Sequence, residues 1–181
     1  MLYNKDMERF YSKISGTPVM EDDAMRPLTT IKDVLIDSET GKVIAFIVNL
    51  SKNLIITPMD ILSWHDAIHV HDRDSIIEGN EVLRVENVQK SGTRVIHNRV
   101  ETKDGKYLGK VVDFSIDSHS MDLKKLYVAK GFLGLFRYES RIIPAKNIIE
   151  ILPEKIVVKE DLAVIKQEEK EKIVMEDLAA T

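Results

Sequence analysis

The sequence of 181 residues contains no cysteine. Disulfide frameworks, thiolate zinc sites and cysteine nucleophiles are therefore excluded, and the chain fits a reducing compartment. Long hydrophobic runs are missing as well, because the longest, Val43–Val48, is far shorter than the roughly 20 residues that span a bilayer. The charges scattered through the first residues do not match a secretory signal. We expect a cytoplasmic protein without a membrane span.

Loops typical of the common enzyme classes are also absent. The segment Gly105–Lys110 lacks the spacing and the Ser or Thr of a phosphate-binding loop, and no Gly-x-Ser-x-Gly nucleophile elbow occurs. The formal net charge of −4 argues against non-specific nucleic-acid binding, which needs many uncompensated Lys and Arg residues. We expect a protein that is not an enzyme, with no catalytic residue and no cofactor.

What the sequence does contain is an internal repeat. Three segments of the first half recur in the second half, and the offset between the copies grows from 76 to 80 and then to 86 residues. A growing offset is expected of duplicated units when the second unit has gained loop residues. The pairs are Ser15–Met20 with Ser91–Ile96, Lys32–Asp37 with Val112–Asp117, and Ile55–Trp64 with Arg141–Ile151.

Each copy contains short segments typical of β-strands. Val43–Leu50 is rich in β-branched residues and too short for a typical buried helix. Gly41 and the pair Asp104–Gly105 are typical of hairpin turns, and Pro144 interrupts a strand because it cannot donate a ladder hydrogen bond. Short strands separated by frequent turn signals predict a small barrel or sandwich in each half, with a separate core in each.

The segment between the two copies has a different period. Val82, Val85 and Val88 recur at every third residue, which is typical of a short amphipathic helix. Asn80 is expected to cap this helix, which should end near Lys90. We expect this connector to pack against one of the two barrels.

The second copy carries a recognisable pattern, Gly-x-x-Leu-Gly-Lys-Val-x-Asp, followed later by Ile-Pro before a short helical turn. Its residues are Gly105, Leu108, Gly109, Lys110, Val111, Asp113, Ile143 and Pro144. This pattern resembles the PRC-barrel domain family. The first copy is similar but degraded, because Thr29 and Thr30 lie near the place of the Leu-Gly pair. It keeps Asp33, Asp37, Gly41 and Val43.

The resemblance implies an all-β protein of two tandem small PRC-type β-barrels joined by a short helix. The expected boundaries are 1–78 for the first domain, 79–90 for the helical connector, 91–161 for the second domain and 162–181 for a charged C-terminal tail. Family members include the cytoplasmic part of the photosynthetic reaction-centre H subunit and one half of a ribosome-maturation factor. The resemblance therefore implies a module that works by protein–protein contact, without characteristic catalytic residues.

Three histidines, His65, His69 and His71, are candidate metal ligands. If the alternate residues point into a core, His69 and His71 share the outer face of a strand. The repeat offers Val157 and Lys159 at the equivalent places, and full metal sites need three or four ligands with supporting partners. We expect solvent-facing imidazoles, with a metal site as the alternative.

Two pairs of carboxylates occupy equivalent positions, Asp33 with Asp37 and Asp113 with Asp117. General acid–base chemistry would require one member of a pair to be perturbed in a cleft. Their repetition before turns favours a structural role instead, in which Asp accepts backbone N–H bonds as the chain reverses.

The segment Lys130–Arg141 places apolar bulk between glycines at a hairpin connection. Such bulk either covers the end of a barrel as a flap or forms a docking patch, because aromatic and Arg side chains dominate protein interfaces. The candidate partner-binding residues are Phe132, Leu133, Phe136 and Arg137.

The sequence thus favours a non-enzymatic scaffold or adaptor that binds another protein or a second copy of itself. The alternative is a ribosome- or RNA-associated assembly factor, which needs a basic face. That face would comprise Lys103, Lys106, Lys110, Lys124, Lys125 and Lys130. A metal-dependent enzyme built on the histidines is a third hypothesis.

The end of the chain contains an echo, because Lys172–Ala179 repeats most of Lys155–Ala163. The tail is expected to be either a frayed or helical charged segment, or an edge strand on its own barrel or a neighbour's.

Overall fold

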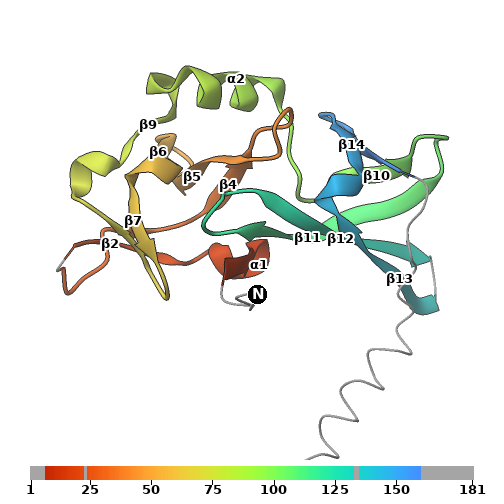
Figure 1. Ribbon diagram of the computed structural model, residues 1–181, viewed down its shortest axis with the longest axis horizontal. Helices are drawn as coiled ribbons and strands as arrows, with labels where there is room; N and C mark the ends of the chain where they lie inside the picture. The colour runs from red at the N-terminus through yellow and green to blue at the C-terminus, as the bar shows by residue number, and fades with distance from the viewer. Residues whose placement is uncertain (1–6, 23, 133–134, 160–181) are drawn as a thin grey trace, which may run out of the picture.

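The computed structural model describes the backbone of residues 7–22, 24–132 and 135–159, and the side chains of these residues except 131–139. Within this part the chain is mostly β, with two α-helices (Figure 1). The predicted all-β class is confirmed. The described strands pair into three separate sheets and form no closed barrel.

Two four-stranded sheets are built from the first half of the chain, in the orders β3-β2-β8-β7 and β4-β5-β6-β9. β2 and β8 are parallel, whereas β4–β5 and β5–β6 are antiparallel hairpins. The strands of the first sheet are β2 (Pro18–Glu21), β3 (Thr29–Thr30), β7 (Ile61–Trp64) and β8 (Ile68–Val70). Those of the second are β4 (Asp33–Ile36), β5 (Val43–Asn49), β6 (Leu54–Ile56) and β9 (Ile77–Glu78).

The second half forms one seven-stranded sheet, in the order β13-β12-β11-β10-β15-β14. Its seventh strand, β1, comes from the first half of the sequence and pairs antiparallel with β11. The strands are β1 (Glu8–Phe10), β10 (Arg99–Thr102), β11 (Tyr107–Asp117), β12 (Leu123–Phe132), β13 (Leu135–Pro144), β14 (Ile148–Ile151) and β15 (Lys155–Val158).

Helical segments are short. The α-helices are α1 (Tyr11–Ile14) and α2 (Leu83–Ser91), and the 3₁₀ turns are η2 (Pro58–Asp60), η3 (Arg73–Ser75), η4 (Gly79–Glu81) and η5 (Ala145–Asn147). The helical turn predicted after Pro144 is η5, and it is confirmed.

The two predicted Asp turns are present at equivalent hairpins. Asp37 Oδ1 accepts the N–H of Glu39 at 2.9 Å, and Asp117 Oδ1 accepts the N–H groups of His119 and Ser120 at 2.9 and 3.0 Å. These bonds replace ladder partners that the backbone loses where the chain reverses. Gly41 completes the first hairpin with a φ of 70°, a conformation that glycine adopts without strain.

One of the predicted repeat pairs is wrong. Ser15–Met20 contains most of β2, whereas Ser91–Ile96 ends before β10 begins at Arg99. β2 and β10 are the true counterparts, because each runs parallel to the last strand of its half, β8 and β15 respectively. The similar letters of the two segments therefore do not mark the same place in the fold.

The connector helix α2 packs on one sheet, as predicted. Val85 and Val88 are buried against the outer face of β4, β5 and β6. The predicted cap at Asn80 is wrong, because Asn80 lies in η4 and α2 begins after Val82. A capping box between Glu78 and Glu81 stabilises η4 and delays the start of the helix.

An ion pair also fastens α2 to the first hairpin. Arg84 Nη2 lies 2.7 Å from Asp37 Oδ2, and Asp37 is only 3% exposed. Burial alone would raise the pKa of Asp37, but the hydrogen bonds from Arg84 and from the Glu39 N–H hold it below its ordinary value.

The buried apolar side chains of the two halves belong to one continuous cluster, contrary to the expectation of two separate cores. Phe46 and Ile68 from the first half and Phe114 and Leu126 from the second are all at most 1% exposed within it. A second, small cluster lies under α2. Burial of apolar area across the junction therefore stabilises both halves together.

Gly109 of the PRC-like pattern offers a direct test of the second half. It has a φ of 135°, and a Cβ there would clash with the carbonyl oxygen of Ala129 on β12. We expect Gly109→Ala to lower the free energy of unfolding by about 3 kcal/mol, measured by urea denaturation.

Gly105→Ala is the matched control, because Gly105 also has a positive φ but open space around it. Its cost should be only about 1–2 kcal/mol, from backbone strain alone. Equal costs for the two variants would contradict the close approach of β11 and β12 at Gly109.

Candidate functional site

The two halves meet where equivalent hairpins touch at their ends. The N–H of Val43 donates to Met121 O at 2.8 Å, and the N–H of Leu123 donates to Gly41 O at 2.9 Å. The partners are reciprocal, because 41 and 121 are as far apart in sequence as 43 and 123. Lys42 Nζ and Asp122 Oδ1 form an ion pair across the same junction at 2.9 Å. The arrangement is that of an isologous contact inside one chain.

Helix α1 fills the space between the two hairpins. The Tyr11 hydroxyl donates to Asp33 Oδ1 at 3.1 Å, and its ring stacks on Phe114 with centroids 4.8 Å apart. Ser12 donates through both its N–H and its hydroxyl to Asp113, at 3.1 and 2.7 Å. Equivalent aspartates of the two halves thus bind neighbouring residues of one helix.

This placement corrects the turn role predicted for Asp33 and Asp113. Both accept the N–H of the next residue within a strand, Val34 and Phe114 respectively, rather than at a reversal. A carboxylate can do this where the strand has no neighbour to receive that N–H. Asp33 Oδ1 also accepts from the Tyr11 hydroxyl, and Asp113 Oδ2 accepts from the Ser12 hydroxyl, so both carboxylates bind α1.

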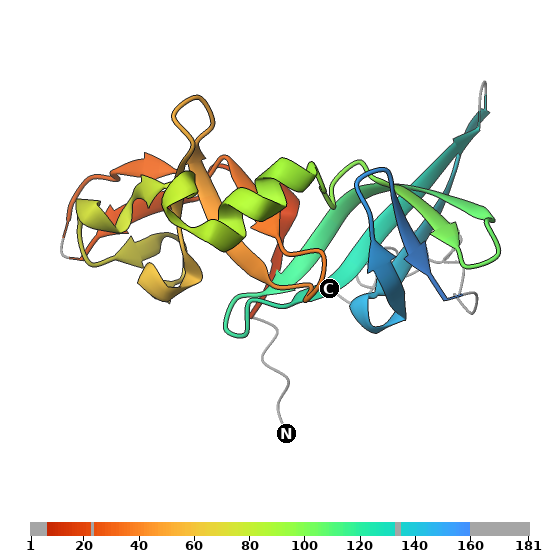
Figure 2. The ribbon, with the colours of Figure 1, turned by 90° about the horizontal axis from the view of Figure 1, so that it is seen from above.

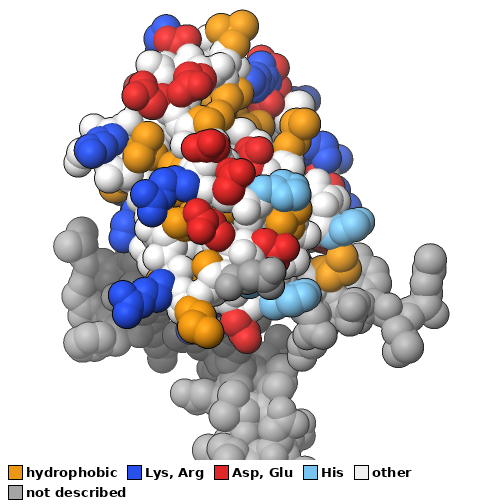
Figure 3. Space-filling view, turned by 90° about the vertical axis from the view of Figure 1, so that its left-hand side faces the viewer, with side chains coloured by type: hydrophobic (Ala, Val, Ile, Leu, Met, Phe, Trp, Pro, Cys, Tyr) orange, Lys and Arg blue, Asp and Glu red, His pale blue; other side chains and the backbone are white. Residues whose placement is uncertain are grey.

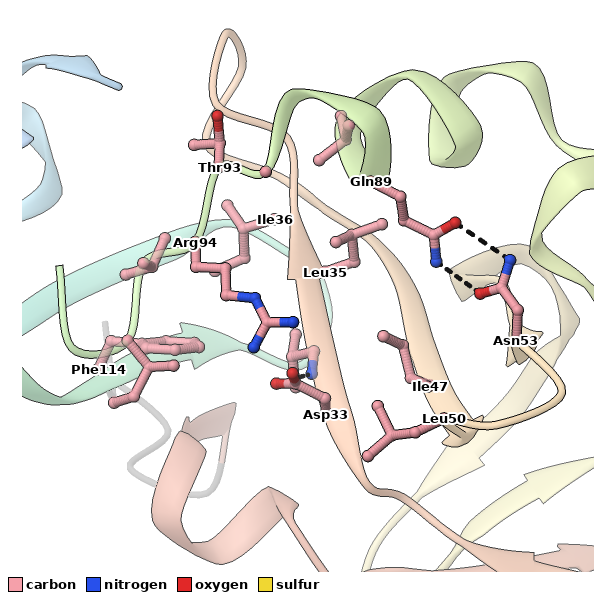
Figure 4. A pocket seen from close by; sticks show the side chains of 15 residues that line it. Asp33, Leu35, Ile36, Ile47, Leu50, Asn53, Gln89, Thr93, Arg94 and Phe114 are labelled. Atoms are coloured by element: carbon pink, nitrogen blue, oxygen red, sulfur yellow. Dashed lines mark hydrogen bonds between the residues drawn. The ribbon is translucent and has the colours of Figure 1, made fainter. Parts of the chain in front are cut away.

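A cavity of about 240 Å³ opens beside α1, along the free edge of β4 (Figure 4). All four residues of β4, Asp33–Ile36, line one wall, and the connecting segment Gly92–Ile96 lines the other. Ile47 and Val88 supply apolar surface, and Asn53 closes one end. We call this cavity the β4 groove.

Polar groups lie at both ends of the β4 groove. Asn53 and Gln89 exchange two side-chain hydrogen bonds, at 3.1 and 2.7 Å, and so satisfy each other. At the other end the guanidinium of Arg94 lies in the gap between the connecting segment and β4, on the side of Asp33 (Figure 4). Among the described residues no carboxylate forms an ion pair with Arg94, so its donors remain available.

The equivalent edge in the second half is occupied. β1 pairs with β11 so that Glu8, Arg9 and Phe10 face Asp117, Ile116 and Ser115. The Glu8 carboxylate accepts from Ser115 Oγ at 2.6 Å and from Lys125 Nζ at 2.9 Å, and the Phe10 ring lies 5.4 Å from that of Tyr127. Burial would raise the pKa of Glu8, but the hydrogen bonds from Ser115 and Lys125 hold it below its ordinary value.

The structure does not bring the three candidate histidines into one site. His69 lies in β8 between the buried residues Ile68 and Val70, whereas His71 is exposed beyond the strand end. His65 belongs to the β7–β8 turn, where its N–H donates to Ala67 O. Among the described side chains no group of three His, Asp or Glu could hold a metal ion. Figure 3 shows histidine side chains on this end of the molecule, separated from one another by side chains of other kinds.

The candidate docking residues lie at the end of a long hairpin. Phe132 is the last residue of β12, and Phe136 and Arg137 lie near the start of β13. Leu133 is outside the described residues, as are the side chains of the other three. Figure 2 shows the hairpin projecting past the rest of the sheet.

Two of the six lysines of the alternative RNA-binding hypothesis already contact other side chains. Lys124 and Lys125 lie at a register shift of the β11–β12 pair, between the buried residues Leu123 and Leu126. Lys125 is paired with Glu8, and Lys130 lies over the Tyr107 ring at 5.7 Å.

Sequence comparison now places part of the chain. The model of the PRC-barrel domain family matches residues 7–84. This segment is a PRC-barrel domain. The matched segment includes β1, α1 and β4, which lines the β4 groove. The Gly-x-x-Leu-Gly-Lys-Val-x-Asp pattern, in contrast, lies in the second half. A search of curated proteins finds no match.

Neither of the two described α-helices is long and apolar enough to cross a bilayer. The echo at Lys172–Ala179 lies outside the described residues, so its two alternatives stay open.

Sequence analysis missed the β4 groove. Its wall Asp33–Ile36 lies within the repeated segment Lys32–Asp37, but the residue types there do not indicate which edge of a strand is free. The one available signal was the repetition of Asp33 as Asp113, which marks the place where each half binds α1.

Tyr11 makes the α1 contact testable by pH. Burial and the neighbouring carboxylate of Asp33 raise the pKa of Tyr11 to about 12. The unfolded phenol loses its proton near pH 10, so between about pH 10 and 12 the folded state holds the extra proton. The free energy of unfolding should therefore fall as pH rises through this window.

Tyr11→Phe should show a shallower fall than the wild type in urea unfolding across that range. Asp33→Asn keeps a hydrogen-bond acceptor but removes the charge, and its slope should lie between the two. An identical slope for wild type and Tyr11→Phe would contradict the Tyr11–Asp33 contact.

Proposed function

We propose that this protein is a non-enzymatic PRC-barrel scaffold or adaptor that works in the cytoplasm by binding another protein. The observation that carries the proposal is the hairpin of β12 and β13. β12 pairs with β11 only up to Ala129, opposite Lys110, but its pairing with β13 continues from Lys130 to Phe132. We call this outer part, residues 130–139, the arm.

The course of the arm supports docking rather than a flap. Its described residues pair across the β12–β13 hairpin and extend away from the sheet (Figure 2). Large apolar residues at the end of a projecting hairpin fit a pocket on a partner, because buried aromatic anchors supply most of the binding energy at interfaces. The partner-binding residues we propose are Phe132, Leu133, Phe136 and Arg137.

We further propose that the second half, 91–161, is a PRC-type unit duplicated from the first. The reciprocal bonds between the Val43 and Leu123 hairpins support this, as do the matched roles of Asp33 and Asp113. Two units fixed to each other would present two different surfaces to partners at a constant spacing, which suits an adaptor.

The test is the double variant Phe132→Ser with Phe136→Ser. We expect an unchanged melting temperature and loss of the proteins that co-purify with the tagged wild-type chain from its native cell, identified by mass spectrometry. The matched control is Met59→Ser with Leu83→Ser, two residues that are 94% and 71% exposed outside the arm. This control should retain the same partners.

A lower melting temperature with retained partners would show that the arm's apolar residues belong to the fold, and it would refute the docking role. Ribosomal proteins in the wild-type sample, lost at high salt, would support the RNA-associated alternative instead.

A further inference from the structure

The two halves differ at the outer edge of equivalent strands, β4 of the β4–β5 hairpin and β11 of the β11–β12 hairpin. In the second half, β11 receives β1 along Ser115–Asp117. In the first half the equivalent stretch, Leu35–Asp37, belongs to the end of β4 and the turn after it, and β4 is the edge strand of its sheet. The space where a strand would lie is the β4 groove.

The pairing of β1 shows which backbone groups are available on β4. Asp117 N–H donates to Asp122 O within its own hairpin, and Ser118 N–H donates outward to Met7 O beside β1. Alternation in an antiparallel pair then directs the N–H and C=O of Ile116 toward β1. Asp37 N–H likewise donates to Lys42 O, so Ile36 directs its N–H and C=O into the groove.

The walls of the β4 groove define which side chains an added strand should carry. A residue opposite Ile36 would point to the same side of β4 as Arg94, whose side chain lies between Ile36 and Asp33 (Figure 4). The next residue, opposite Leu35, would contact Leu35, Ile47 and Val88, which are all apolar. An acidic residue followed by a large apolar one is the complement of these two positions.

The carboxylate of Asp33 does not close the site to an acidic ligand. Its Oδ1 already accepts from the Tyr11 hydroxyl and the Val34 N–H. Arg94 presents five donors in a planar fork, so it can face Asp33 and still bind a second carboxylate.

We propose that the β4 groove binds an extended segment of another protein, added antiparallel to β4 as β1 is added to β11, with an acidic residue opposite Ile36 and an apolar residue after it. The site lies on the first half, away from the arm, and the proposal does not rest on the arm's docking role. Edge strands left open in this way are the usual sites of strand addition.

The experiment is a titration of the full ¹⁵N-labelled chain with the capped peptide acetyl-Thr-Val-Glu-Leu-Thr-amide, followed by amide chemical shifts. We expect shifts at Leu35 and Ile36, and slower hydrogen exchange of the Ile36 amide. The same peptide N-methylated at Glu cannot exchange backbone bonds with Ile36 and should bind at least tenfold more weakly.

A charge exchange tests the side-chain part. Arg94→Glu should weaken the Glu peptide about tenfold and favour a peptide with Lys at that position. Arg94 is exposed, so this change leaves the core intact. The Phe132→Ser/Phe136→Ser variant should bind the Glu peptide like the wild type, which separates this proposal from that of the arm.

Four results would overturn the proposal. One is the absence of shifts at Ile36, and a second is equal binding of the N-methylated peptide. Another is an Ile36 amide that is already protected in the free protein and more so at higher concentration, which would identify a second copy as the occupant. Protection that is independent of concentration would identify a segment of the same chain.

Discussion

The structure depends on the contact between two equivalent hairpins, which hold each other by reciprocal backbone hydrogen bonds. Val43 bonds to Met121 and Leu123 to Gly41, so neither hairpin leaves its end unpaired. Helix α1 then binds Asp33 of one half and Asp113 of the other. Backbone groups buried without partners are costly, so these bonds hold the halves together along with the shared apolar core.

That constraint explains why the halves are not alike at their edges. β1 precedes α1, so once α1 sits between the halves β1 reaches the edge of β11. The segment that precedes β10 is the end of α2 and the stretch Gly92–Ile96, which lies beside β4 without pairing to it. One edge is therefore filled and the other is left as a groove, even though the strands themselves match.

Local chemistry allowed much of the fold to be predicted from the sequence. Asp37, Gly41 and Gly105 each stabilise the turn in which they lie, so their hairpins could be predicted from neighbouring residues alone. The valines of α2 were found by their period, but its start was misplaced because the competing capping box of Glu78 and Glu81 was not weighed against Asn80. The similarity between Ser15–Met20 and Ser91–Ile96 was misleading, because the residue types repeat but only the first segment contains part of a strand.

The site was harder to predict because it depends on residues far apart in sequence. Asp33 and Asp113 were singled out as a pair, yet their role appears only when α1 lies between them. The β4 groove forms because Arg94 faces β4 and no described strand pairs with that edge of β4. A local sequence pattern does not indicate whether a strand has a neighbour on a given edge. The three histidines, in contrast, were candidate metal ligands because they are close in sequence, but the fold does not bring them into one site.

The shared junction makes the two halves one cooperative body. Amide hydrogen exchange at increasing urea concentration tests it most directly, by comparing the buried strands β5 and β12. If the account is right, the slowest amides of both strands exchange with the same free energy and the same dependence on urea. Two distinct free energies, with one strand opening while the other stays protected, would contradict it.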